Sequence, residues 1–69
     1  MAQLNPEIRD ELDRRVYDVM LLNPTPAIDI CTALGLDWAL DAHELRGSLL
    51  RLQEQGKAAL TYGRGWAKL

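Results

Sequence analysis

The sequence predicts an α+β fold in which three helices precede a C-terminal antiparallel hairpin. Three helix-start signals occur along the chain, and each is followed by apolar residues at helical intervals. Residues 56–69, GKAALTYGRGWAKL, instead alternate in polarity on either side of a Gly-Arg-Gly apex, as the arms of a hairpin do. Because 69 residues suffice for only one small core, we expect a single domain over residues 1–69.

The first helix is expected to begin at Asn5-Pro6, where the asparagine caps the helix and the proline fits its first position. Asn23-Pro24 ends it, since a residue before proline avoids helical geometry. Apolar residues recur between these signals in one stripe: Ile8, Leu12, Val16, Val19 and Met20. The charged residues off the stripe are expected to be solvated: Arg9, Asp13 and Arg14.

A second helix of about nine residues is predicted from Thr25-Pro26, which repeats the order of a cap followed by proline. Its buried face would consist of Ile30, Cys31 and Leu34, and Gly35 would end it. The position of Cys31 favours a small apolar side chain, so we expect a buried and unreactive thiol.

A third helix is predicted from Asp41, because Asp41 and Glu44 have the spacing of a capping box. The helix would end at Gln55-Gly56. Its inward face would carry Leu45, Leu49 and Leu52. The preceding residues, Asp37 to Leu40, lengthen the turn after the second helix, and we expect Trp38 and Leu40 to fill a gap in the core.

The outer face of this third helix is unusual in composition. A projection at 100° per residue places on it His43, Gly47, Leu50, Arg51 and Glu54, with Arg46 on its flank. Leu50 would be an exposed apolar residue, and Gly47 would cost about 1 kcal/mol relative to alanine. Either another part of the protein covers this face or a binding partner approaches it closely.

The hairpin is predicted to turn at Gly63-Arg64-Gly65, where the glycines allow a tight loop and leave the arginine projecting. A two-stranded hairpin is marginally stable alone, so we expect it to pack on the helices. Leu60 and Leu69 are the expected inward anchors. A third short strand is expected near residues 23–26.

Charge is distributed unevenly along the chain. Residues 1–40 hold three basic and seven acidic side chains, whereas residues 41–69 hold five basic and three acidic ones, within a total net charge of −2. The excess of positive charge in the second part is the direction expected of a surface that meets a polyanion.

Several classes of function are not indicated. The single cysteine and single histidine do not supply a four-ligand zinc site, and we expect neither a metal nor a cofactor. No nucleophilic triad or glycine-rich phosphate loop is present, so we expect no enzymatic activity. The chain shows neither a signal peptide pattern nor a membrane-spanning run, and a cytoplasmic protein is therefore expected.

Two segments carry a resemblance to a known family. Ile30-Cys31-Thr32-Ala33-Leu34-Gly35-Leu36 resembles the second helix and turn of winged helix-turn-helix proteins, and Leu45 to Lys57 resembles their recognition helix. With the terminal hairpin as the wing, the resemblance covers essentially the whole chain. Many members of this superfamily are bacterial DNA-binding regulators, so the resemblance implies a small transcription regulator with a two- or three-stranded wing.

The resemblance also implies candidate contacts with double-stranded DNA, because the third helix would enter a major groove and the wing would touch phosphates. These candidates are His43, Arg46, Gly47, Ser48, Arg51, Lys57, Arg64 and Lys68. With few basic residues and an isoelectric point near 5.1, only weak or dimer-dependent DNA binding is expected. Alternatively, the domain binds a protein partner or a second copy of itself through apolar residues: Leu50, Tyr62 and Trp66, with the Leu21-Leu22 pair.

Overall fold

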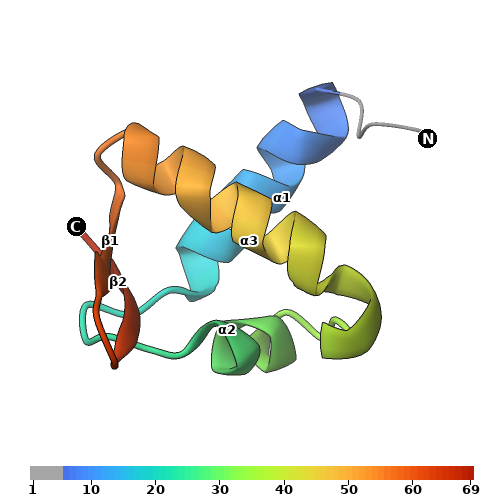
Figure 1. Ribbon diagram of the computed structural model, residues 1–69. Helices are drawn as coiled ribbons and strands as arrows, with labels where there is room; N and C mark the ends of the chain where they lie inside the picture. The colour runs from blue at the N-terminus through green and yellow to red at the C-terminus, as the bar shows by residue number, and fades with distance from the viewer. Residues whose placement is uncertain (1–5) are drawn as a thin grey trace.

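The computed structural model describes residues 6–69, which form three helices followed by a two-stranded antiparallel sheet (Figure 1). This order confirms the predicted α+β architecture, while the predicted cap at Asn5 lies outside the described residues. The elements are α1 (Pro6–Val19), α2 (Ala27–Ala33), α3 (Trp38–Glu54), β1 (Ala58–Thr61) and β2 (Gly65–Lys68).

The core lies between the three helices and the inner face of the sheet. Its buried side chains come from all five elements and their ends: Val16, Met20, Ile30, Cys31, Leu45, Leu49, Leu52, Ala58 and Trp66. The predicted inward positions of α3 are therefore confirmed, as is the burial of Cys31. Ile8 is the exception on α1, because its side chain is 53% exposed. The predicted stripe of α1 thus reaches the core only from Leu12 onward.

Helix α3 begins about one turn earlier than the predicted start at Asp41. Asp37 is the N-cap, and its carboxylate accepts a hydrogen bond of 2.9 Å from the Ala39 backbone N–H. The Asp41 carboxylate in turn accepts one of 3.1 Å from the Asp37 backbone N–H. This reciprocal pair stabilises the earlier start, because each carboxylate accepts from a backbone N–H that has no partner within the helix. The connection from α2 to α3 therefore comprises only residues 34–37.

The expectation that Trp38 and Leu40 fill a core gap is wrong. Both residues belong to the first turn of α3, where their side chains are 41% and 76% exposed, respectively. The longer helix turns them outward, because residues so close to its start lie beyond the part of α3 that contacts the core.

The segment before α2 pairs with the sheet. No side chain caps α2, so the predicted Thr25 cap is not formed. Instead, Thr25 and Trp66 exchange two backbone hydrogen bonds of 2.8 Å. The Lys68 backbone N–H also donates to the Leu21 carbonyl at 2.8 Å. A single bridge thus takes the place of the predicted third strand and fixes the hairpin to the helical body.

The predicted anchors of the hairpin, Leu60 and Leu69, are 51% and 65% exposed, so that prediction is wrong. In the register of the sheet Leu60 lies opposite Trp66, and the Trp66 side chain is buried. The larger indole fills the space beneath the sheet, which leaves Leu60 at the edge of the core. The remaining buried strand residues are Ala58 and Ala67.

Candidate functional site

A buried polar cluster joins α1 to α3. Arg51 donates two hydrogen bonds of 2.9 Å to the Asp13 carboxylate, and the Ser48 hydroxyl donates a short one to the same group. Asp13 is 7% exposed and Ser48 is fully buried. The expectation that Asp13 is a solvated charge is therefore wrong, and the Ser48 side chain does not reach the surface as a DNA contact would require.

The electrostatics of this cluster favour the ionised form of Asp13. Burial of the carboxyl group opposes ionisation, but the hydrogen bonds from Arg51 and Ser48 and the charge of Arg51 outweigh it and lower the Asp13 pKa. The Arg51 side chain is 31% exposed and remains bound to this carboxylate. The Arg51 guanidinium is therefore held in a contact between α3 and α1.

Helical periodicity contained a signal for this cluster. Asp13 precedes Val16, Tyr17 and Met20 by three, four and seven residues, which places it on the apolar side of α1. On α3, Ser48 follows Leu45 by three residues and precedes Leu52 by four, so it also lies on the apolar side of its helix. One polar residue on the apolar stripe of each helix indicates that the two meet, because an unpaired buried polar group is costly.

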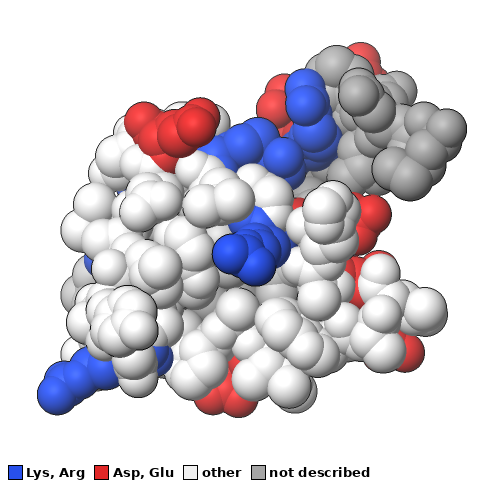
Figure 2. Space-filling model, viewed as in Figure 1, with Lys and Arg blue, Asp and Glu red and all other residues white. Residues whose placement is uncertain are grey.

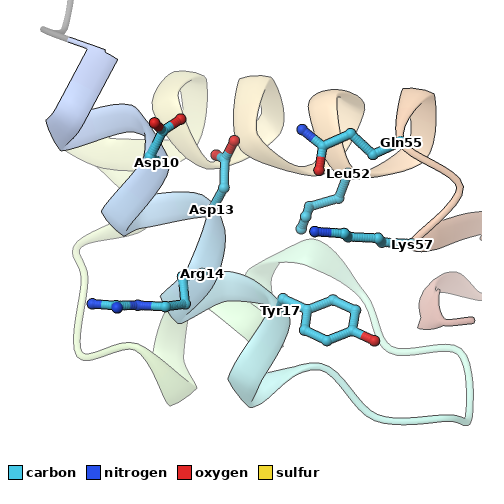
Figure 3. Close-up of a pocket in the computed structure, with 7 residues that line it drawn as sticks. All are labelled: Asp10, Asp13, Arg14, Tyr17, Leu52, Gln55 and Lys57. Atoms are coloured by element: carbon cyan, nitrogen blue, oxygen red, sulfur yellow. The ribbon is translucent and has the colours of Figure 1, made fainter.

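Two further cations of the predicted DNA-contacting set also lie on the α1 side. The Lys68 ammonium lies 4.4 Å from the centre of the Tyr17 ring, a cation–π contact. Lys57 lines an open pocket of about 340 Å³, and Figure 3 shows its side chain extending toward α1. The pocket lining consists of Asp10, Asp13, Arg14, Tyr17, Leu52, Gln55 and Lys57. Both lysines therefore lie beside α1, and Lys57 shares its pocket with Asp10 and Asp13.

An apolar groove lies between α2, α3 and the sheet. It has a volume of about 380 Å³ and is lined by Ala27, Trp38, Ala42, His43, Arg46, Leu49, Leu60 and Trp66. Trp38 and Leu60 are its large half-exposed apolar side chains. The lining includes the cationic Arg46 and contains no acidic residue.

A second hollow continues this surface toward the tip of the hairpin. It measures about 270 Å³ and is lined by Pro26, Leu60, Thr61, Tyr62, Gly63, Arg64 and Gly65. Leu60 lines both hollows, so they adjoin at this residue, and we call the two together the α3–hairpin groove. Its two cationic side chains are Arg46 and Arg64, and neither lining includes an acidic residue.

The remaining candidate contact residues differ in how exposed their side chains are. Leu50 and Tyr62 are exposed, at 44% and 99%, as a protein-contacting role requires. Trp66 is only 7% exposed, so its assignment to an apolar contact surface is corrected to a core position that borders the groove. A Cβ added at Gly47 would lie 3.4 Å from the Arg51 Nη1, which is within ordinary van der Waals contact.

The outer surface seen in Figure 2, which has the α3 face toward the viewer, is largely uncharged. Its lysine and arginine side chains form separate groups rather than one continuous band. The predicted basic face is therefore divided: Arg51, Lys57 and Lys68 lie on the α1 side, and Arg46 and Arg64 border the groove.

Residues 6–69 give little indication of a metal site, a membrane-spanning helix or a reactive cysteine. No cluster of three or more potential metal ligands occurs in that range. No helix formed by those residues has the length and apolar character needed to cross a bilayer. Burial, followed by the negative charges of Asp41 and Asp37, raises the pKa of the Cys31 thiol and lowers its reactivity at neutral pH.

Comparison with known proteins does not identify a relative. No protein-family model, curated protein or solved structure matches this chain significantly.

Proposed function

We propose that this chain is a winged-helix protein-interaction module whose α3–hairpin groove binds an apolar, acidic segment of a protein partner. The observation that carries the proposal is the composition of the groove, which combines apolar walls with two arginines and lacks acidic side chains. Such a surface favours a ligand that buries apolar groups and places carboxylates near Arg46 and Arg64.

The winged-helix assignment is supported by three features of the fold. Three helices precede an antiparallel hairpin, only residues 34–37 separate α2 from α3, and Thr25 adds a bridge beside β2. The earlier start of α3 removes the long insertion expected between these helices. The hairpin then corresponds to the wing and α3 to the recognition helix.

The charge distribution favours a protein ligand over DNA. DNA affinity depends strongly on the number of phosphates that lysine and arginine neutralise. Of the five basic residues expected on the DNA-binding face, Arg51 is paired with Asp13, and Lys57 and Lys68 lie beside α1. Two arginines bordering an apolar groove would provide little phosphate binding, whereas burial of Trp38 and Leu60 by a protein segment is favourable.

DNA binding is the second candidate function. Arg46 and Arg64 both border the α3–hairpin groove with no acid in either lining, and His43 is exposed beside them. In a winged helix, this combination of recognition helix and wing tip is the part that contacts DNA. A second copy of the chain bound to the same duplex would double the number of arginines that contact phosphates.

The proposal can be tested by selecting ligands from a displayed library of random peptides. We expect enriched sequences to combine apolar residues with Asp or Glu, and their addition to shift the backbone amide signals of groove residues such as Trp38, Arg46 and Leu60. Two variants should weaken binding of a selected peptide about tenfold: Arg46→Glu and Leu60→Ser.

Matched controls are available elsewhere on the surface. Arg14→Glu makes the same charge change on α1, and Leu22→Ser removes an apolar side chain that is 76% exposed on the following loop. Both should retain peptide binding. Selection of basic sequences, or equal loss of binding in the controls, would overturn the proposal.

A parallel titration with random-sequence duplex DNA separates the second candidate. At low salt, a DNA-binding domain should show shifts near Arg46 and Arg64 that disappear as the salt concentration rises. DNA-dependent shifts together with a failed peptide selection would replace the proposed function by DNA binding.

A further inference from the structure

The first turns of α1 present an apolar residue that the described chain leaves about half exposed. Ile8 is 53% exposed, and the packed part of α1 begins at Leu12. Figure 1 shows these first turns extending beyond the rest of the helical body. The apolar stripe of α1 thus continues past the core that it helps to form.

The surroundings of Ile8 are acidic. Residues 6–11 contain Glu7, Asp10 and Glu11 against Arg9 alone. Glu11 lies one turn from Ile8 on the same side of the helix, and its closest cation is Arg14 at 3.9 Å, with both side chains well exposed. This segment is therefore an apolar residue accompanied by negative charge.

We propose that the occupant of the α3–hairpin groove is a second copy of this chain, which inserts Ile8 and the acidic first turns of α1. This inference depends on the proposed function, since it names the partner of the same groove. Ile8 would pack against Trp38 and Leu60, and the acidic residues would lie near Arg46 and Arg64. The charges of the two surfaces are opposite and similar in size, which favours their association.

This contact joins two different surfaces of the chain, so it can form reciprocally or in one direction only. Reciprocal insertion between two copies would close a dimer with two identical contacts, while one-way insertion would build longer assemblies. Two helical turns in a short groove cover less than the roughly 1,200 Å² typical of stable complexes. The association is therefore weak, rises with protein concentration and falls with added salt.

The decisive experiment mixes two variants that each lose one side of the contact. Ile8→Ser removes the inserted residue but keeps the groove, and Leu60→Ser alters the groove but keeps the first turns of α1. Each variant alone should self-associate at least tenfold more weakly than the unmodified chain in analytical ultracentrifugation. Circular dichroism and thermal unfolding verify that both variants remain folded, as expected for side chains that are 53% and 51% exposed.

In the mixture, isotope-labelled Ile8→Ser protein provides the intact groove and unlabelled Leu60→Ser protein provides the intact α1. The amide signals of Trp38 and Arg46 should shift in the labelled protein when the unlabelled variant is added. Addition of unlabelled Ile8→Ser protein should leave them unchanged. Leu22→Ser serves as a control that should associate like the unmodified chain.

The outcomes also separate this inference from the proposed function. A chain that stays monomeric at millimolar concentration, or mixed variants without groove shifts, would overturn the second copy as partner even if selected acidic peptides still bind the groove. A groove that binds neither acidic peptides nor a second copy would overturn both. Groove shifts with the peptides and with the complementary variant would support both.

Discussion

Arg51 on α3 donates two parallel hydrogen bonds of 2.9 Å to Asp13 on α1, a residue 38 positions earlier in the chain. The Ser48 hydroxyl completes the environment of the same carboxylate. Both helices use a position on their apolar side for this cluster, which fixes how they pack along each other. The geometry is that of a bidentate arginine–carboxylate pair, the more specific form of ion pair.

Replacement of Asp13 by asparagine should destabilise the fold by about 2 kcal/mol. The variant leaves the Arg51 guanidinium without its carboxylate, and partial exposure of Arg51 keeps the loss below that of a fully buried pair. Urea unfolding measures the difference. Asp10→Asn, an exposed carboxylate one turn earlier, should change stability by less than about 0.5 kcal/mol. Equal stability of the two variants would show that the cluster contributes nothing.

Stability should fall in acid through the titration of Asp13. Its pKa is lower in the folded protein than the ordinary value of 3.8, so the folded state binds fewer protons than the unfolded state in this range. The contribution is fully present above about pH 5 and is lost as the pH falls through the folded pKa. The stability difference between the unmodified chain and Asp13→Asn should therefore shrink between about pH 5 and pH 2. A constant difference over that range would contradict this assignment.

Gly65 should tolerate no side chain. Its φ is 119°, and an added Cβ would overlap the backbone of Thr25 and lie 2.6 Å from the Pro26 nitrogen. We expect Gly65→Ala to cost about 3 kcal/mol or more, because it adds backbone strain and separates the Thr25–Trp66 bridge.

Gly63 provides the matched control for that substitution. It also has a positive φ, 77°, but open space surrounds its added Cβ. Gly63→Ala should therefore cost only the conformational strain of about 1 kcal/mol. Thermal unfolding of the two variants compares these values directly, and similar losses would argue against the close approach of Thr25 to β2.

Cys31 should react slowly with iodoacetamide in the native protein. The thiol is buried and its pKa is raised, so thiolate forms mainly when the structure opens. We expect labelling at neutral pH to be at least about a hundredfold slower than in 8 M urea, which corresponds to an opening free energy of roughly 3 kcal/mol. Mass spectrometry follows the reaction. Rapid labelling without denaturant would indicate that α2 separates easily from α3.

Local sequence signals predicted most of the secondary structure. The apolar spacing of Leu45, Leu49 and Leu52 identified the inner face of α3, and the Gly-Arg-Gly apex identified the hairpin. The start of α3 was placed one turn late because two capping arrangements overlap, and Asp41 takes part in both. The reciprocal hydrogen bonds of Asp37 and Asp41 stabilise the earlier of the two starts.

The candidate site was less predictable from the sequence. Arg46 and Arg51 are five residues apart on one helix, yet one borders the groove and the other is bound to Asp13. Leu60 was expected in the core, but the Trp66 indole occupies that space and leaves Leu60 as part of a binding surface. Both differences depend on contacts between distant elements.

By itself, the sequence determined the order of the helices and hairpin and most of the residues on the apolar faces of the helices, whereas α1 ends at Val19, before the predicted stop at Asn23-Pro24. The order and the apolar faces depend on backbone and side-chain interactions within a few residues, which are readable from neighbouring positions. Only the tertiary structure decided which cations are paired, which apolar side chains stay exposed and where the α3–hairpin groove lies. Those outcomes follow from how α1, α3 and the sheet pack, and packing brings together side chains as far apart in the sequence as Tyr17 and Lys68.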